Sequence, residues 1–147
     1  MILLNLSQSV SVNAPIDRVF DCWAALERAP EHQKPTIDRT KLTDGPIGRG
    51  TRYSALDQWP GRKVSFEMEI TAYERPSRIA ARWDEPMSGS WEARFRADGD
   101  DTVMDFETTI EPSGLMGVFA PLMKPWAGRQ LSSGMASFKA WVESGGC

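Results

Sequence analysis

The chain has 147 residues, of which 41% are hydrophobic and 25% charged, and its net charge at pH 7 is −3. This composition is typical of a folded globular protein, and the length predicts a single domain over residues 1–147. The acidic balance offers no basic surface, so nucleic acid is not an expected partner, and no apolar run approaches the ~20 residues of a membrane span.

Cysteine and histidine are scarce. Cys22 and Cys147 are too far apart in the sequence to form a metal or redox motif, so we expect both thiols to be reduced. The start of the chain is too short and uncharged for a secretory signal, which favours a cytoplasmic protein. His32 is the one histidine, so a histidine-rich metal centre is excluded. We expect no metal and no cofactor.

The first elements are a strand and two short helices. Residues 4–12 alternate between apolar and polar, which predicts a strand with one dry face that includes Gln8. After Pro15, apolar residues recur at helical spacing and predict a short helix: Ile16, Val19, Phe20 and Trp23. A second short helix is predicted from Leu26 to about His32.

The middle of the chain repeats strands and turns. The predicted strands cover residues 36–42, 51–59, about 64–71, 78–83, about 91–95 and 102–110. Turns rich in Gly, Pro and Asp separate them. Short strands joined in this way predict an antiparallel meander and not a fold of alternating strands and helices.

The last segment returns to helical spacing, from about residue 117 to 142. Pro125 has no amide hydrogen to donate, which predicts a kink or a delayed start. The helix is therefore predicted for 127–142, and 115–126 stays open. An antiparallel sheet with one dry face needs a cover, and this helix is the element long enough to supply it.

Large rings and small residues are interspersed on the predicted inner face of the sheet. Such a face leaves a hollow as readily as it fills a core, and apolar hollows with a few polar groups are the usual form of small-molecule sites. Both interpretations stay open. The residues predicted to contact a ligand are Gln8, Trp59, Met68, Trp83, Trp91, Phe95, Phe106, Thr108, Phe119, Met123 and Trp126.

Several motifs resemble one family. Residues 10–15 (VSVNAP) followed by 19–23 (VFDCW) are similar to the opening of the START-related helix-grip (SRPBCC) proteins. Further similar segments are 48–51, 73–79, 91–95, 98–102 and 138–143, and the polyketide cyclase/dehydrase-like branch is the nearest in pattern. The resemblance implies an α+β, helix-grip fold: a seven-stranded curved antiparallel sheet that grips a long C-terminal helix, with two short helices after the first strand. It also implies a cavity for an apolar small molecule.

Two residues are candidates for acid–base chemistry. Asp57 shares a strand face with Tyr53 and Trp59, so strict alternation places its carboxylate in the hollow, where it would act as a general base or hydrogen-bond anchor. A register change of one residue would place it in water instead. His32, which the resemblance places at the cavity rim, is either a surface histidine or a partner of Asp57 in proton transfer.

Three functions follow from these observations. The leading one is binding of a small, mostly apolar molecule, an aromatic or polyketide-like metabolite or a lipid, by a carrier or sensor. The alternative is an enzyme of the cyclase, dehydratase or hydrolase type that uses Asp57 and His32. The third is a protein-interaction module. Homodimer formation stays an open alternative.

Overall fold

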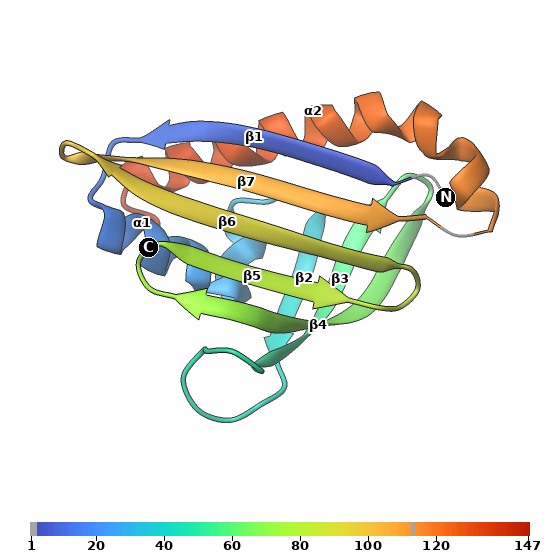
Figure 1. Cartoon of the computed structure of the whole chain (residues 1–147), viewed down its shortest axis with the longest axis horizontal. Helices are drawn as coiled ribbons and strands as arrows, with labels where there is room; N and C mark the ends of the chain where they lie inside the picture. Colours follow the sequence, from blue (N-terminus) through green and yellow to red (C-terminus); the bar gives the residue numbers. More distant parts are fainter. Residues whose placement is uncertain (1–2, 113) are drawn as a thin grey trace.

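The computed structural model describes residues 3–112 and 114–147. The elements in chain order, labelled in Figure 1, are β1 (Leu4–Val12), α1 (Ile16–Ala24), the 3-10 helix η1 (Leu26–Glu31), β2 (Thr36–Lys41), β3 (Arg52–Trp59), β4 (Arg62–Glu74), β5 (Arg78–Trp83), β6 (Ser88–Asp98), β7 (Asp101–Glu111) and α2 (Leu115–Glu143). The α+β class and the predicted element order are confirmed.

The seven strands form one antiparallel sheet in the order β1-β7-β6-β5-β4-β3-β2. Strands β2 to β7 follow one another as a meander, and β1 pairs with β7 at the far edge. The sheet is curved, because β2 and β3 run steeply across the direction of β5, β6 and β7 (Figure 1). This curvature gives the sheet a concave face that a straight helix cannot fill.

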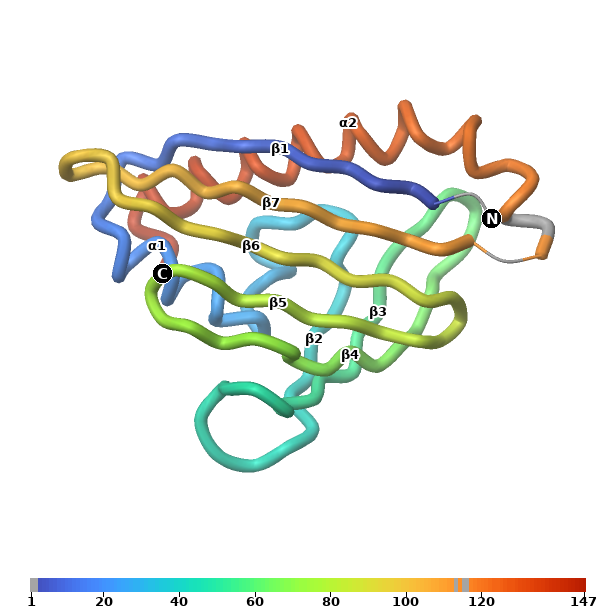
Figure 2. Tube along the Cα trace, in the orientation of Figure 1, coloured from blue at the N-terminus to red at the C-terminus, as the bar shows by residue number. Residues whose placement is uncertain are grey.

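Helix α2 lies beside β1 along one edge of the sheet, as the chain trace in Figure 2 shows. It is continuous from Leu115, so the alternative of a start after Pro125 is wrong. Pro121 and Pro125 lie on the exposed side, where water can replace the hydrogen bonds that a proline removes. In the part of the chain that the structure describes, no helix is both long and apolar enough to cross a membrane.

A densely packed core occupies the end of the sheet nearest α1. Phe20 is fully buried and contacts Phe95 and Tyr73 edge to face, with ring centroids 5.2 and 5.4 Å apart. Edge-to-face contacts of this kind stabilise aromatic cores beyond the area they bury. Phe95, predicted to contact a ligand, therefore belongs to this core: α1 covers it, and nothing in the strand pattern reveals where α1 lies.

The prediction that both cysteines are reduced is wrong. Cys22 on α1 and Cys147 at the chain end form a disulfide, with their Cα atoms 5.6 Å apart. The sequence separation hid the pair, because the turn after α2 brings the tail back to α1. The cytoplasmic location stays a prediction, but it loses the support of reduced thiols, since disulfides persist mainly in oxidising compartments.

Candidate functional site: a cavity between the sheet and the C-terminal helix

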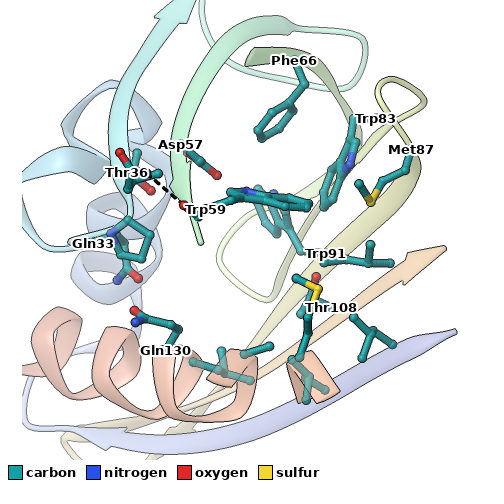
Figure 3. Close-up of a pocket in the computed structure, with 18 of the residues that line it drawn as sticks. Gln33, Thr36, Asp57, Trp59, Phe66, Trp83, Met87, Trp91, Thr108 and Gln130 are labelled. Carbon is teal, nitrogen blue, oxygen red and sulfur yellow. Dashed lines mark hydrogen bonds between the residues drawn. The ribbon is translucent and has the colours of Figure 1, made fainter. Parts of the chain in front are cut away.

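A cavity of about 250 Å³ lies between the concave face of the sheet and α2 (Figure 3). Predicted residues in its wall are Trp59, Met68, Trp83, Trp91, Phe106, Thr108, Met123, Trp126 and the acidic candidate Asp57. Residues that the sequence did not single out complete the wall, among them Gln33, Arg39, Phe66, Met87 and Gln130. Where the strands are regular, alternation places the large rings here, since every second side chain lies on the concave face of the sheet.

Aromatic side chains form most of the sheet side of this wall. Phe66 and Trp83 contact each other with ring centroids 5.4 Å apart, and Trp91 stacks on Phe106 at 6.1 Å. Figure 3 shows the indoles of Trp59, Trp83 and Trp91 turned toward the middle of the cavity. The rings pack against one another and leave space between themselves and α2.

Trp83 depends on a glycine in the neighbouring strand. Gly89 pairs directly with Trp83 across β5 and β6. A Cβ at residue 89 would overlap the six-membered ring of Trp83. The absence of a side chain at Gly89 therefore lets the Trp83 ring lie directly against the backbone of β6.

The carboxylate of Asp57 faces the cavity as predicted, but it is paired. Nη1 and Nη2 of Arg39 donate to its two oxygens at 2.7 and 3.3 Å. The Arg39 side chain is 11% exposed and that of Asp57 17%, so the pair is largely shielded from water. The guanidinium also lies over the Phe66 ring, 5.5 Å from its centroid. Such an arrangement holds both charges in fixed positions.

Sequence reasoning missed Arg39 because β2 is irregular. Strict alternation from Thr36 places Asp38 inward and Arg39 outward. The register between β2 and β3 shifts between Thr36 and Asp38, and Arg39 then faces inward while Asp38 is exposed. A bulge of this kind re-aims the side chains that follow it, and β2 has no glycine to signal it.

His32 is buried, so its interpretation as a surface residue is wrong. It is 6% exposed and packs between Trp141 and Phe138, with ring centroids 4.5 and 5.1 Å away. The Gln33 amide donates to Nδ1 of His32 and to the carbonyl of Gly134, both at 2.9 Å. Burial lowers the pKa of His32 to about 4, so the ring is neutral at pH 7 with its proton on Nε2.

A smaller compartment of about 140 Å³ adjoins the main cavity on its inner side. The two share the walls formed by Gln33, Thr36, Arg39, Met68, Trp91 and Phe106. Trp23, Leu26, Ala29 and His32 line only the smaller one. The Nε1–H of Trp23 is shielded from solvent and has no hydrogen-bond partner among the described residues. We call this space the inner compartment and the larger space the outer compartment.

Two further predicted contacts lie outside the cavity wall. Gln8 accepts a hydrogen bond from the Ser132 hydroxyl at 2.7 Å and so links β1 to α2. Phe119 is 52% exposed on the far side of α2, where the uncertain start of the helix left its facing unpredictable. Thr108 lines the wall, but its hydroxyl donates to the Ser90 carbonyl at 2.9 Å. Within residues 3–112 and 114–147, no three His, Cys, Asp or Glu side chains gather as metal ligands.

Comparison with known proteins connects this architecture to one family. Residues 4–143 match the family described as "Polyketide cyclase / dehydrase and lipid transport". A search of curated proteins gives no match.

Solved structures reproduce the fold at low sequence identity. A protein of Thermus thermophilus is 17% identical with a TM-score of 0.83, over 97% of this chain and 99% of the other. An aromatase/cyclase of a Streptomyces species is 17% identical with a TM-score of 0.80, over 97% and 94%. A START superfamily protein of Mycobacterium smegmatis is 16% identical with a TM-score of 0.79, over 95% and 97%. Because the family model covers nearly the whole chain, the chain belongs to the polyketide cyclase/dehydrase and lipid transport family.

Proposed function

We propose that this protein binds a small, mostly apolar molecule, an aromatic or polyketide-like metabolite or a lipid, and acts as a carrier or sensor. The observation that carries the proposal is the cavity of about 250 Å³ between the sheet and α2, with its tryptophan-rich wall. The family description, which includes lipid transport, supports the same interpretation. The predicted contacts Trp59, Met68, Trp83, Trp91, Phe106, Thr108, Met123 and Trp126 are the residues we propose for binding.

The size of the cavity sets the size of the ligand. An apolar cavity of about 150 Å³ is sufficient for benzene. Both compartments together hold a two- or three-ring aromatic molecule or a short acyl chain. Removing roughly 200 Å² of apolar ligand surface from water contributes about 5 kcal/mol before the costs of association. Micromolar affinity requires about 8 kcal/mol, so polar contacts must add to the binding free energy.

Tryptophan fluorescence tests the proposal directly, because four of the cavity residues are tryptophans: Trp59, Trp83, Trp91 and Trp126. A library of aromatic compounds and fatty acids should contain members that quench or shift the emission. At a concentration of 100 times Kd, such a ligand stabilises the protein by about 2.7 kcal/mol and raises its Tm. If no compound in either class changes emission or Tm, the proposal is wrong.

The position of Asp57 supports one alternative, an enzyme of the cyclase, dehydratase or hydrolase type. Its carboxylate lines the cavity, and positioning a flexible substrate beside it supplies part of a catalytic effect. Asp57→Asn should then abolish turnover of such a substrate and retain binding. The control is Asp84→Asn, at an exposed carboxylate outside the cavity wall. Unchanged turnover in Asp57→Asn would remove this residue from the mechanism.

A further inference from the structure

The first turns of α2 expose apolar side chains to solvent. Val118, Phe119 and Leu122 are 70%, 52% and 76% exposed, and their spacing of three and four residues places them on one side of the helix. Pro121 and Pro125 are exposed in the same turns, which Figure 1 shows at the outer edge of the molecule. Scattered exposed apolar residues need no explanation, whereas a contiguous group of them indicates an interaction surface. We call Val118, Phe119 and Leu122 the apolar patch.

Positive charges accompany the apolar patch. Between Glu111 and Glu143 the sequence contains no Asp or Glu, although the chain as a whole has a net charge of −3. Lys124 and Arg129 lie in the turns that carry the patch and in those that follow, and both are exposed. Within residues 3–112 and 114–147, neither of these cations forms an ion pair with a carboxylate. Arg129 comes seven residues, or about two turns, after Leu122 and so lies on the same side of the helix.

This combination matches the surface of an anionic lipid bilayer. A helix that lies in such a surface inserts its apolar side chains between the acyl chains and places its cations beside the lipid phosphates. A second copy of the chain fits less well, because a twofold interface through the patch would bring Lys124 and Arg129 of both copies together. Three side chains also cover only part of the about 800 Å² that each partner of a stable protein complex buries. Fluid hydrocarbon needs no such complementary surface.

We infer that the protein docks on anionic membranes through the first turns of α2, with the apolar patch in the hydrocarbon boundary and Lys124 and Arg129 on the headgroups. The other side of the same turns contributes Met123 and Trp126 to the cavity wall. The docked protein would therefore hold this wall of the cavity against the bilayer. Docking needs no cavity ligand, so it is independent of the proposed function.

Flotation of the intact protein with lipid vesicles tests the inference. One vesicle preparation contains phosphatidylcholine alone, and the other contains equal parts of phosphatidylcholine and phosphatidylglycerol. We expect binding to the anionic vesicles to be roughly tenfold stronger or more, because each cation at such a surface contributes a factor of about five. Added salt should reduce this preference, since it screens exposed charges. Failure to bind either preparation, or equal binding to both, would overturn the inference and leave the proposed function standing.

A double variant tests the apolar patch. Val118→Ser/Leu122→Ser should weaken binding to the anionic vesicles at least tenfold, because two side chains no longer enter hydrocarbon. Leu122→Ser alone should weaken it less, and this variant serves if the double variant does not fold by circular dichroism. The matched control is Leu42→Ser, at a residue 49% exposed in the loop after β2, which should bind like the wild type. Wild-type binding by a folded patch variant would overturn the role of the patch.

A second double variant tests the charges. Lys124→Gln/Arg129→Gln should lose the preference for anionic vesicles and keep its weak binding to phosphatidylcholine. Its control, Arg94→Gln/Arg96→Gln, removes the same number of charges from exposed positions on β6 and should keep the preference. Equal loss in both variants would assign the effect to net charge and overturn the role of α2.

Sedimentation velocity without lipid tests the alternative occupant, a second copy of the chain. We expect the wild type and Val118→Ser/Leu122→Ser to sediment alike. A wild-type dimer that this variant dissociates, together with no binding to vesicles, would overturn the inference and assign the patch to contact between copies.

Discussion

The imidazole of His32 is enclosed by aromatic rings, and this burial makes the stability of the protein depend on pH. An exposed histidine has a pKa near 6.5, whereas burial lowers that of His32 to about 4. Between these values the unfolded chain binds a proton that the folded protein excludes. The free energy of unfolding therefore falls as the pH decreases from about 6.5 to 4, and this contribution is level above pH 7.

Comparison with His32→Phe isolates the effect from other titrating groups. The loss attributable to His32 should reach up to about 3 kcal/mol at pH 4, the amount that corresponds to the difference between the two pKa values. Denaturant unfolding at several pH values measures it in both proteins. A wild-type curve parallel to that of the variant between pH 4 and 6.5 would show that His32 is protonated without cost.

Residue-level prediction succeeded where strands are regular and failed where they are not. The alternation of β3 placed Asp57 and Trp59 on the cavity side, because the pleat of a regular strand fixes the direction of each side chain. Arg39 escaped prediction because the register shift in β2 reverses that direction. The burial of His32 depends on Trp141, which is far away in the sequence, and no local pattern contains that contact.

At the scale of elements, periodicity predicted the strands and the short helix α1. It predicted the later part of α2 but not the residue at which that helix begins. Its apolar spacing indicated the helix, but Pro121 and Pro125 obscured its start at Leu115. Proline is costly inside a helix, and only the packing of the whole molecule decides whether the helix continues through it. Met123 and Trp126 from this ambiguous segment nevertheless lie in the cavity wall as predicted, whereas Phe119 from the same segment is exposed.

The disulfide joins α1 to the tail that follows α2, and its removal should destabilise both. Cys147→Ser should lower the free energy of unfolding by about 2–4 kcal/mol under oxidising conditions, since the bond closes a loop of 125 residues in the unfolded chain. Thermal unfolding with and without a reducing agent measures the effect. Under reducing conditions the variant and the wild type should unfold alike, and a persistent difference would assign the effect to something other than the bond.

The whole molecule carries an empty space in its interior, and that space reduces its stability. Cavities of this size remove packing contacts that a filled core would have, so the free protein should gain stability when side chains fill the space. Ala127 lines the cavity from α2 and offers a position for such a change. Binding and stability are therefore expected to oppose each other in this fold.

Ala127→Leu should raise the free energy of unfolding by about 1 kcal/mol and weaken any cavity ligand at least tenfold. Its matched control is Ala136→Leu, on the exposed side of the same helix, which should leave binding unchanged. Thermal unfolding and ligand titration on both variants give the two quantities. Unaltered affinity in Ala127→Leu would mean that the ligand binds elsewhere.

The close approach of Gly89 to the indole of Trp83 means that the shape of the cavity depends on a residue that does not line it. A methyl group at residue 89 would overlap the Trp83 ring, so the indole would have to leave its present position in the cavity wall. A chain with alanine or serine at this position would therefore have a cavity of a different shape, and the ligands that fit it would differ accordingly. The residue at position 89 would then influence which ligands fit, although it is not part of the cavity wall.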